Sequence, residues 1–345
     1  MTSPRDRLVA PVFVTGSPRS GTTLMQNCLA RDPAVYHLGR ESRFIWHRLD
    51  GQEVTGCFPH PDDIARAYLD ELFVGDQPWS REDLVRWARR CGSQGMPPQY
   101  LDLPHDLIDE LSHEFPLDHG GPFADTEHSE TAPFTIPPSG AHFAQAGNGP
   151  IRMADKDTGH CWRLPELSNA FPDARFIFMV RDPEPAIRSL VAGWRHPTWF
   201  FTYRIDEALS IKGYSDEFTW GRRWWNFNIF PGYDQMFDQP LEYVCAEQWS
   251  AAMRPMIDNG LPLAAEGRAL FISFEEFIAR PQEILRRVAV FCDFDLDGIT
   301  ATGLDKVYMS MQKDTWNPGD NEARIREAAE RARTVLEPIA DFISG

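Results

Sequence analysis

The sequence lacks the features that mark several classes of protein. It has no run of about 18 apolar residues, and its first seven residues lack the apolar core of a signal peptide, so we expect a cytoplasmic protein that does not span a membrane. Positive charge is scarce too, because 34 Lys and Arg face 51 Asp and Glu, which gives a net charge of −17. This balance argues against sequence-independent binding to DNA or anionic membranes, and we expect no nucleic-acid partner. An anion that binds this chain must therefore meet a local basic pocket.

Metal-binding patterns are also absent. The six cysteines form no CxxC pair and no close Cys/His set of the kind that binds zinc, and they are Cys28, Cys57, Cys91, Cys161, Cys245 and Cys292. Such spacing favours reduced cysteines that pack as small apolar residues. The ten histidines are scattered as well. We therefore predict no metal site.

The composition is that of a folded protein. Hydrophobic residues make up 42% of the chain and charged residues 25%, which excludes a disordered, collagen-like or coiled-coil protein. Strand and helix patterns alternate along the chain. Strands are predicted at 11–16, 174–180 and 269–273, and helices at 20–31, 61–74, 80–90, 183–194, 274–279, 282–292 and 321–344. This alternation predicts an α/β fold with a central parallel sheet flanked by helices.

The domain organisation is less regular than the strand pattern. A length of 345 residues fits two ordinary domains or one elaborated domain. Nine prolines within residues 91–152 interrupt any helical or strand period. We predict one domain over residues 1–345, with an irregular insertion at about 60–150 and an aromatic-rich segment at about 196–268.

The segment 16–23, which reads GSPRSGTT, joins the first predicted strand to its helix. Its two glycines are five positions apart, as in a phosphate-binding loop, but Thr22 and Thr23 stand where a kinase or GTPase has Lys and then a Mg²⁺-binding hydroxyl. Here the cation is Arg19, inside the loop. Its guanidinium can grip a terminal oxyanion, while the backbone N–H groups of 20–23, from Ser20 through Gly21 to Thr23, hold an adjoining phosphate. Such a loop suits a phosphate without metal, and the alternative is a glycine-rich turn that binds nothing.

A second motif follows the second predicted strand. Residues 176–189 read FIFMVRDPEPAIRS, so Arg181 leaves the carboxyl end of a strand and Ser189 lies on the next helix. The two side chains can converge on one phosphate at the edge of the sheet. The alternative is an ordinary strand exit with a surface arginine.

On these motifs the chain resembles the sulfotransferases that use 3′-phosphoadenosine 5′-phosphosulfate (PAPS). Residues 18–24 are similar to the family's 5′-phosphosulfate loop in its arginine form, and residues 176–189 to its 3′-phosphate motif. The resemblance implies a P-loop-like three-layer α/β fold with a loop- and helix-rich insertion. It also implies that the chain is an enzyme with PAPS as co-substrate and no metal.

The likeness is strongest to the tyrosylprotein sulfotransferases and their bacterial relatives. Residues 39–43 resemble the segment that carries the family's catalytic glutamate and a neighbouring arginine, which implies a catalytic Glu41 and a substrate-binding Arg43. Residues 155–157 resemble the family's lysine element, which implies a catalytic Lys156. Residues 273–281, with Phe291, resemble a later structural stretch.

The resemblance also implies roles in sulfuryl transfer. Glu41 is the predicted general base, and Lys156 and Arg19 stabilise the oxygens that gain charge. The 5′-phosphate is assigned to residues 20–23, and the 3′-phosphate to Arg181 and Ser189. A rival base is His160, because the cytosolic aryl sulfotransferases use a histidine that follows a lysine element. His160 lies four residues after Lys156, which is farther than in that family, so we favour Glu41.

The acceptor is the least determined part of the prediction. The stretch between the phosphate loop and Glu41 is one residue longer than the tyrosylprotein pattern, and we see no membrane anchor. We therefore expect a small-molecule, glycan or lipid acceptor rather than a peptide tyrosine. An aromatic cluster forms either an acceptor pocket or ordinary core, and it comprises Trp220, Trp224, Trp225, Phe227, Phe230 and Tyr233. The alternative functions are a metal-dependent P-loop nucleotide kinase and a non-catalytic nucleotide-binding module.

Overall fold

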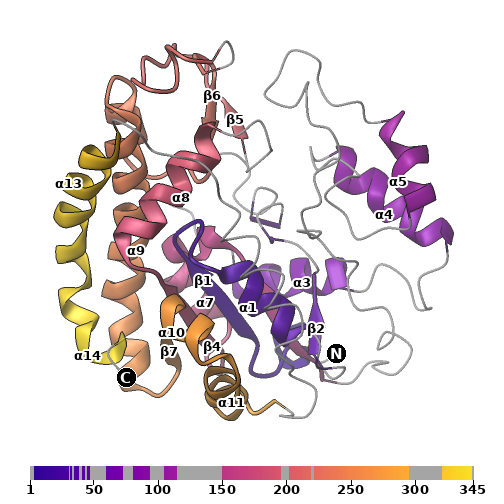
Figure 1. Ribbon diagram of the computed structural model, residues 1–345. Coiled ribbons are helices and arrows are strands. Elements are labelled where there is room, and N and C mark those ends of the chain that lie inside the picture. The colour runs from indigo at the N-terminus through magenta and orange to yellow at the C-terminus, as the bar shows by residue number, and fades with distance from the viewer. Residues whose placement is uncertain are drawn as a thin grey trace.

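The protein is built on a five-stranded parallel sheet. The computed structural model describes residues 4–30, 32, 35–38, 41–42, 45–46, 60–72, 81–93, 105–114, 150–195, 202–218, 221–294 and 321–343. The strand order is β2-β3-β1-β4-β7 (Figure 1). In chain order the strands are β1 (Val12–Gly16), β2 (Val35–His37), β3 (Arg152–Lys156), β4 (Arg175–Val180) and β7 (Ala269–Ser273). All four pairings are parallel, so the predicted central parallel sheet is confirmed.

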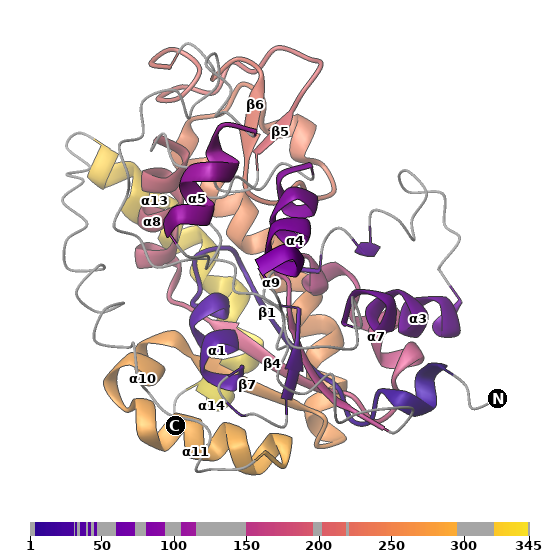
Figure 2. The same ribbon diagram turned by 90° about the vertical axis from the view of Figure 1, so that its right-hand side faces the viewer.

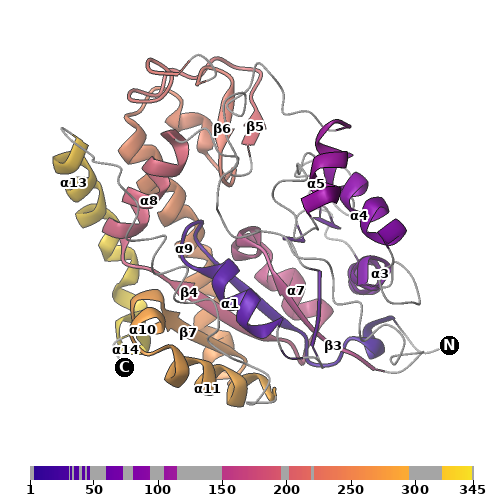
Figure 3. The same ribbon diagram turned by 45° about the vertical axis from the view of Figure 1, so that its right-hand side comes forward.

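Helices cover both faces of the sheet, because alternate residues of each strand point to opposite sides. One face packs against α1 (Thr22–Leu29), α10 (Phe274–Ala279) and α11 (Pro281–Cys292) (Figure 3). The other face is rich in phenylalanine and packs against α7 (Leu164–Ala170) and α9 (Leu241–Ala265). The result is a three-layer α/β fold.

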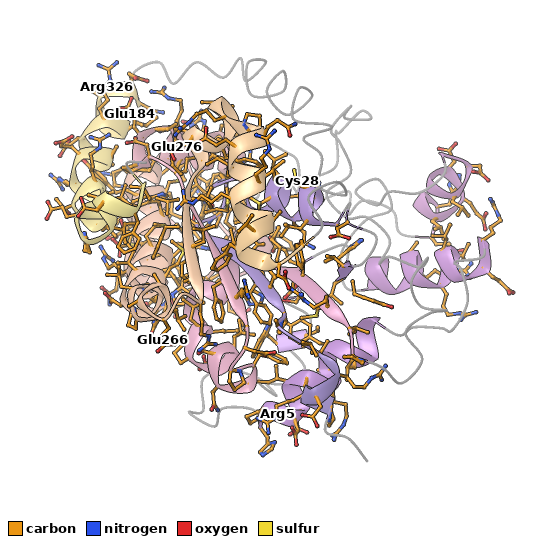
Figure 4. The ribbon with its side chains drawn as sticks, turned by 90° about the horizontal axis from the view of Figure 1, so that it is seen from below. Arg5, Cys28, Glu184, Glu266, Glu276 and Arg326 are labelled. Atoms are coloured by element: carbon orange, nitrogen blue, oxygen red, sulfur yellow. The ribbon has the colours of Figure 1, made fainter. Side chains whose placement is uncertain are left out.

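An outer pair of helices extends the second layer. α8 (Pro183–Arg195) and α13 (Glu322–Arg333) both pack against α9 (Figure 1). The single long helix predicted over 321–344 is wrong in detail, since a 3₁₀ turn at Thr334–Ile339 separates α13 from α14 (Ala340–Ile343). Pro338 lies inside that turn, and proline cannot donate the backbone hydrogen bond that a continuous helix needs there. Seen from below, Glu184 and Arg326 lie at one edge of the molecule (Figure 4).

The region around 60–150 contains regular structure as well as proline. Three helices lie in it, namely α3 (Pro61–Leu72), α4 (Arg81–Ser93) and α5 (His105–Ser112), and α4 and α5 pack against each other on the same side of the molecule as α3 (Figure 2). The segment 91–152, which the sequence predicts to be irregular, therefore contains helix α5 and reaches the first residue of β3. Helix α3 carries Tyr68, which is fully buried and reaches the sheet.

Shorter elements complete the described chain. A two-stranded antiparallel hairpin is formed by β5 (Thr202–Arg204) and β6 (Trp224–Asn226), and 3₁₀ turns lie at Pro4–Arg7, Thr158–Trp162 and Tyr233–Met236. Among the described residues, no helix combines the length and the apolar character that crossing a bilayer requires.

Candidate active site

The residues that the sequence analysis singled out meet at one edge of the sheet. Arg19 follows β1, Glu41 lies four residues beyond β2, Lys156 is the last residue of β3, and Arg181 follows β4 directly. Because the strands are parallel, their carboxyl ends lie along the same edge, where ligands of open α/β sheets bind. Residues far apart in the sequence are therefore neighbours in the fold.

The loop between β1 and α1 is held in an unusual backbone conformation. Arg19 has φ 69° and Gly21 has φ 86°, both in the left-handed region. A side chain on Gly21 would also collide with the ring of Phe274, because an added Cβ would lie 2.4 Å from its Cδ2 atom. Helix α1 starts directly after Gly21, and no side chain caps it. The first N–H groups of a helix lack partners within the helix, so this end carries the donors and the partial positive charge that suit an anion.

Arg19, Arg181 and Ser189 form one cluster. The Arg19 Nε donates to Ser189 Oγ at 3.0 Å, and the Arg181 Nη1 donates to the Arg19 carbonyl oxygen at 2.8 Å. The Arg181 guanidinium also lies over the Phe274 ring, 4.8 Å from its centroid. The two phosphate motifs predicted from the sequence are therefore in direct contact. Two guanidinium groups beside an uncapped helix N-terminus make a donor set that fits a ligand with more than one phosphate.

Glu41 and Lys156 form an ion pair on the other half of the edge. The Lys156 Nζ donates to Glu41 Oε1 at 2.5 Å. The two side chains are only 9% and 5% exposed, respectively. Removing either partner of such a buried pair would be destabilising, because it would leave an uncompensated charge away from water. It places a proton acceptor and a cation in contact at one point.

His160 lies in the 3₁₀ turn Thr158–Trp162 after β3 and contacts Asp155, the strand residue before Lys156. Its ring is completely buried, with Nε2 2.7 Å from Asp155 Oδ2 and 3.3 Å from Ser42 Oγ. The ring edge also packs against Phe13 at a centroid distance of 5.5 Å. Asp155 and Lys156 are consecutive strand residues, so their side chains point to opposite sides. This placement favours Glu41 over His160 as the group that meets an acceptor.

Two further titratable groups near the edge stay neutral. Burial, with a smaller contribution from the Asp155 charge, raises the pKa of the Tyr68 hydroxyl well above its usual value. Burial raises the pKa of the Cys161 thiol to about 12, although the hydrogen bond with Thr15 acts in the other direction. Tyr68 is therefore a hydrogen-bond donor, and Cys161 is no nucleophile at neutral pH.

The aromatic cluster is largely core. Trp225 is fully buried, and its ring contacts Trp194 at 5.0 Å and Tyr233 at 5.4 Å between centroids. Phe227 and Phe230 are both 3% exposed. These contacts account for the aromatic-rich segment without an acceptor. Arg43 and Trp220 lie outside the described residues.

Sequence reasoning missed the polar groups that surround His160. Ser42 and Asp155 lie within hydrogen-bond distance of His160 Nε2, Tyr68 contacts both Ser42 and Asp155, and all of them are fully buried. The sequence signal for these groups is the polar run at the end of β3, which the resemblance assigns only to the family's lysine element. Within the part of the chain that the structure describes, no group of three or more His, Cys, Asp or Glu could hold a metal ion.

Comparison with curated proteins gives distant but consistent relatives. The chain is 21% identical over 244 residues to the protein-tyrosine sulfotransferase of Drosophila melanogaster, covering 67% of this chain and 40% of that protein. It is 21% identical over 286 residues to protein-tyrosine sulfotransferase A of Caenorhabditis elegans, covering 83% and 50% respectively. The chain thus spans about half the length of these curated relatives.

Two solved sulfotransferase structures have a distant likeness to this chain. The sulfotransferase domain from the curacin biosynthetic pathway has a TM-score of 0.41 and 14% identity, covering 84% of this chain and 75% of that one. Sulfotransferase STF9 from Mycobacterium avium has a TM-score of 0.39 and 19% identity, covering 98% and 77%.

The family model described as "Sulfotransferase family" matches residues 11–90 and 139–227. These two ranges include the loop after β1, Glu41, Lys156, Arg181 and Ser189, which are the residues that meet at the carboxyl edge of the sheet. Over these residues the chain is similar to the sulfotransferase family.

Proposed function

We propose that this chain transfers the sulfuryl group of PAPS to an acceptor hydroxyl. The observation that carries the proposal is the contact between Lys156 and Glu41 on the same sheet edge as the Arg19 and Arg181 guanidinium groups. Sulfuryl transfer needs a proton acceptor, cations for the moving group and a site for the leaving phosphate. The described residues supply all three.

The β1–β4 half of the edge would hold the nucleotide. Backbone N–H groups at the start of α1, with Ser20, Thr22 and Thr23, would bind the 5′-phosphate, while Arg181 and Ser189 would bind the 3′-phosphate. Arg19, whose Nε already contacts Ser189, would bridge the two. The chemistry of these donors fits PAPS, because none of the steps assigned to them requires a metal.

The β2–β3 half would carry the chemistry. Glu41 would take the proton of the acceptor hydroxyl as the acceptor oxygen forms a bond to sulfur. The bond from sulfur to the 5′-phosphate oxygen breaks, and Lys156 would donate to the oxygens that gain charge. The products are a sulfate ester and 3′,5′-ADP, with the acceptor proton on Glu41.

The acceptor is proposed to be a small molecule, a glycan or a lipid. The extra residue between the phosphate loop and Glu41 supports this choice over a peptide tyrosine. We would incubate the protein with ³⁵S-labelled PAPS and a panel of phenols, glycans, lipids and tyrosine peptides. Label on one of the first three classes is expected, and label on tyrosine peptides alone would overturn the acceptor class.

A thermal-shift measurement tests nucleotide use without any acceptor. A ligand that binds only the folded state stabilises it, by about 2.7 kcal/mol at 100 times its Kd. PAPS or 3′,5′-ADP should therefore raise the Tm in the presence of EDTA. A rise with ATP and Mg²⁺ but not with PAPS would contradict the proposal and favour a nucleotide kinase. A rise with PAPS and no transfer to any acceptor would favour a non-catalytic nucleotide-binding module.

A further inference from the structure

Four buried polar side chains contact one another in a ring, and two of them belong to residues adjacent in sequence to Glu41 and Lys156. Asp155 Oδ2 accepts a hydrogen bond from the Tyr68 hydroxyl at 2.7 Å and lies 2.7 Å from His160 Nε2. Ser42 Oγ lies 3.3 Å from both the Tyr68 oxygen and His160 Nε2. All four side chains have no measurable exposure. Each pairs with two of the others, so we call this set the buried network.

The buried network joins the two segments that carry the proposed reacting groups. Ser42 follows Glu41 in the chain, and Asp155 precedes Lys156. Tyr68 comes from α3 and His160 from the 3₁₀ turn after β3, so neither belongs to those two segments. A shift of Ser42 relative to Asp155 would stretch hydrogen bonds on both sides.

The geometry excludes a nucleophilic triad. Asp155 and Ser42 both approach the same ring nitrogen of His160, Nε2, whereas a triad places the acid and the nucleophile on opposite nitrogens. Ser42 is also sealed from any substrate. Buried polar groups of this kind cost desolvation and give in return fixed directions between elements, because hydrogen bonds are directional.

We propose that Tyr68, Ser42, Asp155 and His160 are positioning residues that hold the Glu41 carboxylate against the Lys156 ammonium for proton transfer. The kinetic consequence of this inference rests on the proposed function. The structural part of the inference, which is that the buried network anchors the segment containing Glu41, does not depend on the proposed function. Misplacement of a reacting group by about 1 Å can cost about 10²-fold in rate.

The kinetic test compares two buried tyrosines. Tyr68→Phe removes only the hydroxyl of the network, and Tyr214→Phe removes an equally buried hydroxyl that donates to the Trp224 carbonyl oxygen at 2.8 Å. With ³⁵S-PAPS and the acceptor identified in the panel, Tyr68→Phe should lower kcat about tenfold or more and leave the Kd of 3′,5′-ADP unchanged. Tyr214→Phe should leave both within about twofold. Equal kcat losses in the two variants would overturn the proposal.

A double-mutant cycle tests whether the network acts through Glu41. In a Glu41→Gln background there is no base left to position, so adding Tyr68→Phe should lower kcat by less than about twofold. A full additional tenfold loss would show that Tyr68 acts elsewhere and would refute the positioning role.

The structural part has a readout that needs no transfer activity. The Ile45 amide donates to the Ser42 carbonyl oxygen at 2.8 Å, so loosening Ser42 should speed hydrogen exchange at that amide. Exchange of Ile45 in the unliganded protein, followed by NMR, should rise at least about tenfold in Tyr68→Phe and not in Tyr214→Phe. Unchanged exchange in both would contradict the anchoring, whereas raised exchange in a protein that transfers no sulfuryl group would fault the proposed function alone.

Discussion

The two halves of the carboxyl edge hold their cations in different ways. On the β1–β4 half, Arg19 donates to the Ser189 hydroxyl, and Arg181 donates to a carbonyl oxygen and lies over the Phe274 ring. On the β2–β3 half, Lys156 is bonded directly to a carboxylate. The Arg19 and Arg181 guanidinium groups lie beside the N-terminus of α1, where an anion is stabilised, whereas Lys156 contacts a carboxylate that can take up a proton. The first half suits binding of an anion, and the second suits a reaction that moves a proton.

Replacement of Glu41 is expected to have the largest effect on the rate of transfer. It should impair the β2–β3 half of the edge and leave the β1–β4 half intact. Glu41→Gln keeps the shape of the side chain and removes its basicity, so kcat should fall by about 10²–10⁴. The Kd of 3′,5′-ADP should change by less than about threefold, because the β1–β4 half is untouched. Steady-state transfer from ³⁵S-PAPS and isothermal titration measure the two quantities.

His160→Gln is the comparison for that experiment. His160 is fully buried and has a positioning role in our proposal, so its loss should lower kcat less than Glu41→Gln does. Near-normal turnover in Glu41→Gln together with a larger loss in His160→Gln would make His160 the base. The chain would then work like the cytosolic aryl enzymes.

A change at Gly21 should damage the phosphate half through the backbone. An alanine there must adopt φ 86° and meets the Phe274 ring, so Gly21→Ala should destabilise the fold by about 2–4 kcal/mol. Gly267→Ala is the matched control, because Gly267 also has a positive φ, 71°, with nothing near an added Cβ. The control should lose only about 1–2 kcal/mol. Urea unfolding measures both, and equal losses would mean that the Phe274 contact adds nothing.

Removal of Arg181 should sharpen the assignment of the two phosphates. Arg181→Ala should weaken 3′,5′-ADP about tenfold to hundredfold, which corresponds to about 1.5–3 kcal/mol for a charge-assisted contact. 5′-AMP lacks the 3′-phosphate, so its Kd should change much less. Titration of both nucleotides decides the matter, and equal weakening would refute the 3′-phosphate assignment.

Much of the sheet and helix framework could be predicted from the sequence. The strand at 269–273 has the bounds of β7, and 174–180 differs from β4 by one residue, because continuous apolar runs between turn residues are clear signals of buried strands. The helix predicted at 20–31 begins at Thr22 instead of Ser20. Its start is delayed by the left-handed Arg19 and Gly21, which sequence periodicity does not register.

The remaining parts depend on contacts between distant segments. Strand β3 ends in Asp155 and Lys156, whose polarity hides a buried strand from any hydrophobic pattern. The buried Asp155 carboxylate accepts a hydrogen bond from Tyr68, 87 residues away, and lies 2.7 Å from His160 Nε2. Helix α9 was also missed, since Pro255 and Pro262 lie inside it and read as breaks. Long-range partners of this kind carry no local sequence signal.

The smallest expected effect concerns the support of α8, the helix that bears Ser189. Arg188, its neighbour, binds both carboxylate oxygens of Glu322 on α13, at 2.5 and 2.8 Å. That contact lowers the pKa of Glu322 below its ordinary value, so its stabilisation is present at neutral pH and is lost as the pH falls through the folded-state pKa. Glu322→Gln should therefore lower the Tm by about 1–2 °C at pH 7, as expected for a partly exposed pair.

The pH dependence makes this prediction specific to the ion pair. The difference in Tm between wild type and Glu322→Gln should shrink as the pH falls through the lowered folded-state pKa of Glu322, because the wild-type carboxylate is then protonated as well. Glu330→Gln is the control on the same helix, since Glu330 pairs with Arg333 across an exposed turn and should change the Tm by less than about 1 °C. The Kd of 3′,5′-ADP should rise slightly in Glu322→Gln alone, because α8 positions Ser189, and kcat should be unchanged. A loss of kcat without any change in nucleotide binding would contradict the division of the edge into a binding half and a reacting half.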